Sequence, residues 1–209
     1  LSGRDNLRLL ADLSGGCPPA RIDAVLERVG LRDRARDPVR VYSHGMKQRL
    51  AIAAALLPGP ELVLLDEPTN GLDPMGIRDV RALIRSLAHD DGLTVFLSSH
   101  LLAEVEQVCN RAGVIHLGRK IWEGEVAELL GARRRLEVVA APADAARAVL
   151  EELAPGQVTE SGGGFTVGGA LDPADAVDRL VAAGCRVSKI VASTPTLEEV
   201  FVELVGGDR

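Results

Sequence analysis

The stretch Glu61–Pro74 reads ELVLLDEPTNGLDP and carries the strongest structural signal in the chain. Its apolar start, Leu62–Leu65, predicts a short strand that is buried on both faces. The strand ends in two adjacent carboxylates, Asp66 and Glu67. Such a pair belongs at the carboxyl end of a parallel strand, where open α/β sheets bind their ligands. Turn-forming residues follow, so the chain is expected to leave the sheet in a loop.

Two neighbouring carboxylates at a strand end suit Mg²⁺-dependent phosphoryl transfer. One of them can hold the metal directly or through water, and the other can orient the attacking water. A strand that ends in Asp-Glu is by itself more often an ordinary solvent-facing strand end. The assignment therefore depends on the segments on either side.

Those segments are YSHGMKQRLAIAAALL at Tyr42–Leu57 and TVFLSSH at Thr94–His100. With ELVLLDEPTNGLDP between them, in this order and at these separations, residues 1 to about 131 closely resemble the ATP-binding subunit of an ABC transporter. The resemblance implies an α/β ATPase domain with a helical subdomain. It also implies ATP and Mg²⁺ as cofactors.

The resemblance assigns roles to three residues near the strand ends. Asp66 matches the Walker B aspartate, which contributes to the Mg²⁺ shell. Glu67 matches the general base or water-orienting residue. His100 matches the switch histidine that contacts the γ-phosphate.

The resemblance also implies a surface that acts in trans, on ATP held by the opposing subunit. Ser43, His44, Gly45 and Met46 match the family signature, and Asp73 matches the aspartate of the D-loop, which crosses the dimer interface. Physically, the serine offers a hydroxyl, the glycine permits close backbone approach, and the following helix directs its positive end at phosphate. The histidine stands where the commonest signature has glycine. Its ring can donate to the nucleotide or point into solvent, and we expect the second.

Two expected motifs are missing from the sequence. A phosphate-binding P-loop needs GxxxxGK[ST], but the chain has only Lys47, Lys120 and Lys189, and none of them follows a glycine. No glutamine corresponding to the Q-loop precedes the signature. Because the chain opens at Leu1 on a segment that resembles the family just after that glutamine, we expect an amino-terminally truncated fragment, inactive alone. Evolved loss is the alternative.

The overall charge and composition of the chain limit the classes of partner that it can bind. The net charge is −6 and the pI is near 5.3, which disfavours nonspecific nucleic-acid binding. The longest apolar run, Leu50–Leu57, is far shorter than the roughly 20 residues of a bilayer span. Three scattered cysteines without CxxC spacing suit reduced thiols in a cytosolic protein. We expect a cytoplasmic protein, peripheral on the inner membrane face through a permease subunit, with no direct span.

The residue pattern predicts the elements of the first part. Ser2 with Asp5 resembles a capping box, so a helix is expected at 3–13. Further helices are expected from 18 or 19 to 29, and at 45–57, 74–88 and 101–109. Strands are expected at 62–66 and 93–97, with a hairpin at 113–123. Alternating strands and helices favour a mostly parallel sheet.

After Gly131 the pattern becomes strand, helix, strand, strand, helix, strand. This order predicts a small ferredoxin-like βαββαβ domain within 132–209, divided from an ATPase domain at 1–131. From Glu137 onward the chain has twelve acidic and five basic residues, a local balance of −7. The glycines at 162–164 are expected to form a hairpin turn. The closing segment 194–206 is expected to be a capped amphipathic helix, and it resembles the ending of daunorubicin- and bacitracin-resistance ATPases.

Three functions compete. The leading hypothesis is the ATP-hydrolysing subunit of an exporter, paired with a second copy or a related subunit through the signature and D-loop. The second is a soluble, non-transport ABC ATPase, although such relatives carry coiled-coil insertions or tandem ATPase units that are not seen in this sequence. The third is a noncatalytic scaffold with a ligand-sensing C-terminal module.

Overall fold

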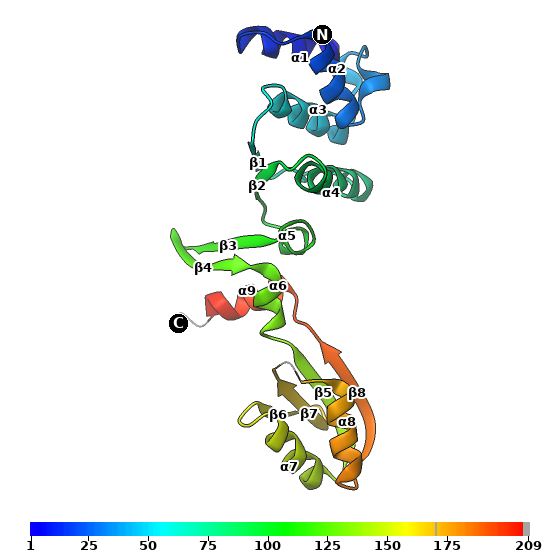
Figure 1. The fold of residues 1–209 in the computed structure, drawn as a ribbon, viewed down its shortest axis with the longest axis vertical. Helices are drawn as coiled ribbons and strands as arrows, with labels where there is room; N and C mark the ends of the chain where they lie inside the picture. The colour runs from blue at the N-terminus through cyan, green and yellow to red at the C-terminus, as the bar shows by residue number, and fades with distance from the viewer. Residues whose placement is uncertain (170, 207–209) are drawn as a thin grey trace. The chain divides into compact units, whose positions relative to one another are not determined.

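A computed structural model describes residues 1–169 and 171–206 of the chain. The fold is α/β, and it comprises two compact units, Leu1–Glu104 and a second unit that begins at Val105 (Figure 1). The sequence-based division between 131 and 132 lies elsewhere and stays a prediction. The two units are described separately.

Three helices open the first unit: α1 (Gly3–Leu13), α2 (Pro19–Arg28) and α3 (His44–Leu56), with short 3₁₀ turns at Arg32–Arg34 and Val39–Val41 between α2 and α3. The predicted capping box is present, because Ser2 and Asp5 exchange hydrogen bonds at the start of α1. The helices contact one another. Leu7, Leu26 and Ile52 are almost completely buried between them.

The remainder of the first unit alternates strand and helix: β1 (Leu62–Asp66), α4 (Pro74–His89), β2 (Thr94–Ser98) and α5 (Leu102–Val108), the last of which runs into the second unit. The strands β1 and β2 pair in parallel, and Asp66 stands opposite Ser98. Helix α3 contacts β1, and α4 contacts β2. The two carboxylates therefore lie at the carboxyl end of a parallel strand, as predicted.

The prediction that β1 is buried on both faces is wrong for this chain. Val63 and Leu65 are buried, whereas Leu62 and Leu64 are 50% and 69% exposed. Phe96, opposite Leu64 on β2, is 66% exposed. Among the residues that the structure describes, only one face of this strand pair is covered, so an apolar face remains accessible to solvent.

After the end of α5, the second unit continues with the predicted hairpin, β3 (Arg111–His116) and β4 (Arg119–Glu125). A short helix that the sequence analysis missed, α6 (Val126–Gly131), follows it. The closing helix, α9 (Leu197–Gly206), contacts α6. It is capped as predicted, because Thr196 and Glu199 exchange hydrogen bonds at its start.

The rest of the second unit is a four-stranded antiparallel sheet with two helices. Its elements are β5 (Arg135–Ala141), α7 (Ala143–Leu153), β6 (Val158–Ser161), β7 (Gly164–Gly168), α8 (Pro173–Ala182) and β8 (Arg186–Ser193). The strand order is β6-β7-β5-β8. Gly162 and Gly163 have positive φ and form the predicted hairpin turn between β6 and β7.

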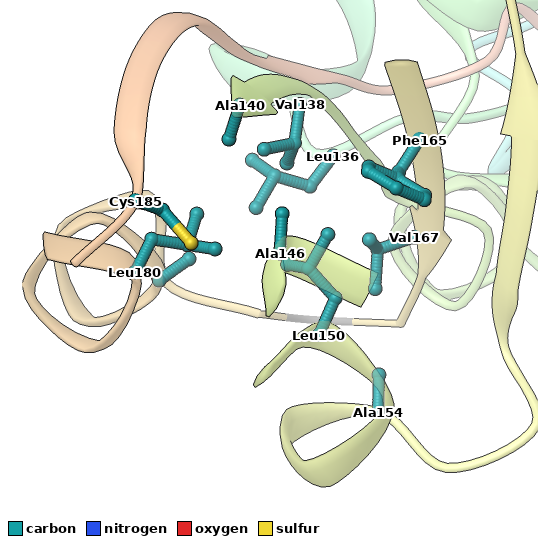
Figure 2. Close-up of a cluster of buried hydrophobic side chains, with 11 residues drawn as sticks. Leu136, Val138, Ala140, Ala146, Leu150, Ala154, Phe165, Val167, Leu180 and Cys185 are labelled. Carbon is teal, nitrogen blue, oxygen red and sulfur yellow. The ribbon is translucent and has the colours of Figure 1, made fainter. Parts of the chain in front are cut away.

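A single hydrophobic core joins this sheet to its helices (Figure 2). Leu136 and Val138 of β5 face Ala146 and Leu150 of α7, and Leu180 of α8 closes one side. All five side chains are at most 1% exposed. None of the helices in the described part of the chain is both long and apolar enough to cross a membrane.

Candidate functional site

The candidate site lies where β1 and β2 end. Their parallel register places Asp66 beside Ser98, and the residues that follow each strand, Glu67 and His100, lie near each other. Nδ1 of His100 is 2.8 Å from Oε2 of Glu67. The His100 side chain is 60% exposed and that of Glu67 is 32% exposed, so both can be reached from solvent.

Glu67 adopts an unusual backbone conformation. Its φ is +46°, in the left-handed region, where a non-glycine residue costs on the order of 1–3 kcal/mol. Its N–H donates to the backbone oxygen of Ser98 at 3.2 Å and to the Ser98 hydroxyl at 3.1 Å. These two bonds hold the turn by which the chain leaves the sheet. They fix the direction of the Glu67 side chain.

The loop after Glu67 consists of two consecutive turns. The N–H of Asn70 donates to the Glu67 carbonyl, and the N–H of Leu72 donates to the Thr69 carbonyl. Pro68 and Thr69 are buried within this loop. The Thr69 hydroxyl donates to the Glu104 carboxylate on α5, and both side chains are buried. This polar pair fixes the loop to the helix that follows His100.

The residues predicted to form the signature lie at the start of helix α3. Ser43 is the N-cap, and its hydroxyl oxygen accepts from the N–H of Met46 at 3.2 Å. The hydroxyl hydrogen remains able to donate to a ligand at the helix N-terminus, where the helix dipole favours an anion. Asp73 plays the same capping role for α4, accepting from the N–H of Gly76 at 2.7 Å.

The starts of α3 and α4 pack closely. A Cβ atom on Gly45 would lie 3.8 Å from the Cα of Gly76, an ordinary van der Waals distance, so the two helix N-termini lie next to each other at this glycine. His44 is exposed, and the expectation that its ring points into solvent and does not donate to the nucleotide stays a prediction. Its ring lies beside the D-loop, with Nε2 3.6 Å from the position that a Cβ on Gly71 would take. The signature and the D-loop therefore form one continuous surface of the first unit.

The structure brings the predicted site residues into two groups. The strand-end group contains Asp66, Glu67 and His100. The helix-start group contains Ser43, His44, Gly45, Met46 and Asp73. Sequence reasoning missed Ser98, Thr69 and Glu104. A hydroxyl directly opposite Asp66 becomes visible only once the β1–β2 register is known.

The residues present fit Mg²⁺ and the terminal phosphate of ATP. Carboxylate oxygens are the ligands that Mg²⁺ prefers, and Asp66 and Glu67 offer them at a strand end, with the His100 imidazole as a hydrogen-bonding group. When bound, the metal would neutralise charge on the phosphates. Glu67 can orient a water or accept its proton, and His100 can position Glu67 and contact phosphate.

Comparison with known proteins agrees with this geometry. The family model described as ABC transporter matches residues 4–70. The bacitracin transport ATP-binding protein BcrA of Bacillus licheniformis is 41% identical over 212 residues, which cover 99% of this chain and 69% of the relative. BcrA of Enterococcus faecalis is 38% identical over 210 residues, covering 99% of this chain and 68% of that relative.

A further relative is the daunorubicin resistance ATP-binding protein DrrA3 of Streptomyces coeruleorubidus. It is 37% identical over 219 residues, covering all of this chain and 69% of the relative. These similarities extend through the four-stranded sheet and the closing helix, well beyond the segment that the family model matches. The chain belongs to the family of ABC transporter ATP-binding proteins.

Proposed function

We propose that the chain is the ATP-hydrolysing part of an exporter of drugs or antibiotics that works through a separate membrane permease. The observation that carries this proposal is the contact between Glu67 and His100 beside Asp66, at the end of a parallel strand pair. These groups are suited to a Mg²⁺-bound terminal phosphate and its attacking water. The similarity to a bacitracin transport and a daunorubicin resistance ATP-binding protein supports the exporter class.

In this proposal a P-loop that is not among residues 1–209 cradles the nucleotide phosphates, and it belongs to the same polypeptide or to another. The apolar face formed by Leu62, Leu64 and Phe96 supports this idea, because a strand pair with such a face gains stability when a further sheet element covers it. The same strands end at Asp66 and Ser98. An element that covers this face would therefore also border the carboxylates.

The signature and D-loop surface would serve a second ATP site in trans. Ser43 offers a free hydroxyl hydrogen at the start of α3, and Asp73 begins α4 beside it. A homodimer, or a pair with a related subunit, would place this surface on nucleotide held by the partner. The protein would be cytoplasmic and attached to the inner membrane face through its permease.

We infer that the sheet after Gly131 is a ferredoxin-like domain. The element order βαββαβ and the strand order β6-β7-β5-β8 support this class. In this proposal the domain boundary lies between residues 131 and 132. The contact between α9 and α6 crosses this boundary. The ATPase chemistry is assigned to 1–131 alone.

A fusion protein tests the proposal. The P-loop portion of BcrA from Bacillus licheniformis is joined to Leu1 of this chain, and this protein is called the P-loop fusion below. It should hydrolyse Mg-ATP, and it should restore bacitracin resistance to a strain in which it replaces BcrA. The fusion carrying Glu67→Gln is the matched control and should do neither.

The two measurements, ATP hydrolysis and bacitracin resistance, test the enzymatic assignment and the exporter assignment separately. ATP hydrolysis without resistance would contradict the exporter assignment and favour a soluble ABC ATPase. A folded fusion that binds ATP but hydrolyses it no faster than its Glu67→Gln variant would contradict the enzymatic assignment. That result would favour the noncatalytic scaffold.

A further inference from the structure

We propose that Ser98 is a positioning residue that couples the Mg²⁺-binding carboxylate to the general base. The proposal rests on the proposed ATPase function for its kinetic test, but not for its structural one. Ser98 is the last residue of β2 and stands directly opposite Asp66 in the parallel register. From this position one hydroxyl reaches both carboxylate residues.

The Ser98 hydroxyl uses its donor and its acceptor capacity at once. It donates to Oδ1 of Asp66 at 2.5 Å, and its oxygen accepts from the N–H of Glu67 at 3.1 Å. A hydroxyl has a single hydrogen to donate, and here that hydrogen points to the Asp66 carboxylate, which fixes the orientation of the hydroxyl. The hydroxyl oxygen in turn holds the N–H of Glu67. The two neighbouring residues are therefore held through one atom.

The bond to Asp66 selects the orientation of its carboxylate. With Oδ1 directed at Ser98, Oδ2 is the oxygen that remains for the metal or a metal-bound water. Supporting partners of this kind fix the ligand's rotamer before the metal arrives, and their loss commonly weakens metal binding or activity 10- to 100-fold. Asp66 is exposed, so packing alone does not hold this orientation.

The bond to Glu67 supports a strained turn. The left-handed φ of this residue persists only if its surroundings hold it, and the N–H is the group through which Ser98 does so. The backbone oxygen of Ser98 accepts from the same N–H at 3.2 Å. Removal of the Ser98 hydroxyl should make the turn more mobile, although the backbone bond still holds it. The Glu67 carboxylate would then occupy a wider range of positions.

Ser99 provides a matched control. It is also a serine on the path from β2 to His100, but its hydroxyl accepts from the N–H of Leu101 and contacts neither carboxylate residue. Ser99→Ala removes the same atom from the adjacent position. A general disturbance of this segment would affect both variants equally, whereas the proposed coupling affects only Ser98→Ala.

The kinetic test uses the P-loop fusion. Ser98→Ala should lower kcat about 10-fold, because misplacement of a catalytic group by about an ångström can cost up to 100-fold. It should also raise the Mg²⁺ concentration at half-maximal rate, with the KM for ATP changed less than about twofold. Ser98→Thr keeps the hydroxyl and should stay within about twofold of the parent, as should Ser99→Ala. Equal losses in Ser98→Ala and Ser99→Ala, or no rescue by threonine, would overturn the proposal.

The structural test uses the chain itself and needs no activity. Three-bond NMR couplings should show one Asp66 χ1 rotamer in the parent and in Ser99→Ala, and rotamer averaging in Ser98→Ala. The Glu67 amide should exchange with solvent faster in Ser98→Ala alone. An unchanged Asp66 rotamer and Glu67 amide would refute the coupling even if the fusion were active. If the parent fusion were inactive but Ser98→Ala changed the Asp66 rotamer and the Glu67 amide exchange, the proposed function would be contradicted and the coupling supported.

Discussion

Nδ1 of His100 lies 2.8 Å from Oε2 of Glu67, so the two residues assigned to the γ-phosphate and to its attacking water contact each other directly. They come from different strand ends, 33 positions apart in the sequence. The parallel pairing of β1 and β2 brings them together. The contact predicts that Glu67 is held where a base is needed before nucleotide arrives.

Glu67→Gln in the P-loop fusion should abolish turnover while preserving ATP binding. The amide keeps the shape of the side chain and can still contact His100, but it cannot accept a proton from water as a carboxylate does. Size-exclusion chromatography with Mg-ATP should show a trapped dimer. Glu61→Gln, at the opposite end of β1, is the control and should turn over normally. Hydrolysis by Glu67→Gln within about threefold of the parent would show that Glu67 is not the base.

Thr69→Val should destabilise the chain by about 1–3 kcal/mol, because it leaves the buried Glu104 carboxylate without its hydroxyl donor. The substitution preserves side-chain volume, so packing changes little. Thr94→Val makes the same chemical change at an exposed position of β2 and should stay within about 0.5 kcal/mol of the parent. Urea unfolding followed by circular dichroism measures both. Equal stabilities of the two variants would mean that the buried pair contributes nothing.

Residues 132–206 expressed alone should fold and melt cooperatively with no dependence on nucleotide, because the core between the sheet, α7 and α8 lies within this segment. Leu180→Ala removes a completely buried side chain and should cost about 2–5 kcal/mol. Its matched control, Val181→Ala on the exposed side of α8, should cost far less. A noncooperative melt of the parent segment would count against the domain assignment.

Within that segment α9 should be the least protected element in hydrogen exchange. Its partner α6 ends at Gly131, and Glu106, whose carboxylate accepts from the N–H of Leu197, is also outside the segment. The ion pairs from Arg133 and Arg135 to Glu203 remain in the segment, but partly exposed pairs of this kind contribute little and do not replace the lost contacts with α6 and Glu106. Strong protection of α9 in isolation would show that these contacts are dispensable.

The acid sensitivity of the helical part should depend on Asp23. The hydrogen bond from Arg4 holds the pKa of this carboxyl below its ordinary value, with the positive charge of Arg4 adding to the effect. A depressed carboxyl pKa contributes stability above the pKa of the unfolded chain, and this contribution is lost as the pH falls through the folded pKa. Asp23→Asn should therefore be less stable than the parent near neutral pH and equal to it in strong acid. A stability difference that does not depend on pH would contradict the pairing.

Local signals in the sequence predicted most elements to within a residue or two. The capping box at Ser2 and Asp5, the turn at Gly162 and Gly163, and the strand before Asp66 each depend on neighbouring residues alone. Helix α6 was missed because it has only six residues and no N-cap side chain.

The other features that the sequence analysis missed or predicted wrongly share a physical cause. Each depends on contacts between residues that are distant in sequence. The burial of β1 was predicted from its apolar residues, but exposure of Leu62 and Leu64 depends on what packs against the strand. The bonds that join Ser98 to Asp66 and Glu67 depend on a strand register across about thirty residues. The pairing of Thr69 with Glu104 likewise requires knowing where the loop meets α5.

Titration of Mg-ATP into the isolated chain and into the P-loop fusion, followed by calorimetry, tests the central claim most directly. The claim is that this chain supplies the carboxylates, the switch histidine and the signature of an ATPase whose phosphate cradle comes from a P-loop outside it. Most nucleotide affinity comes from backbone amides and lysine around the phosphates, and exposed carboxylates without them repel ATP. The account predicts no saturable binding to the chain at up to about 1 mM ATP, and binding with a Kd below about 100 μM to the fusion. A Kd in the low micromolar range for the isolated chain would contradict it, because a complete phosphate site would then exist within these residues.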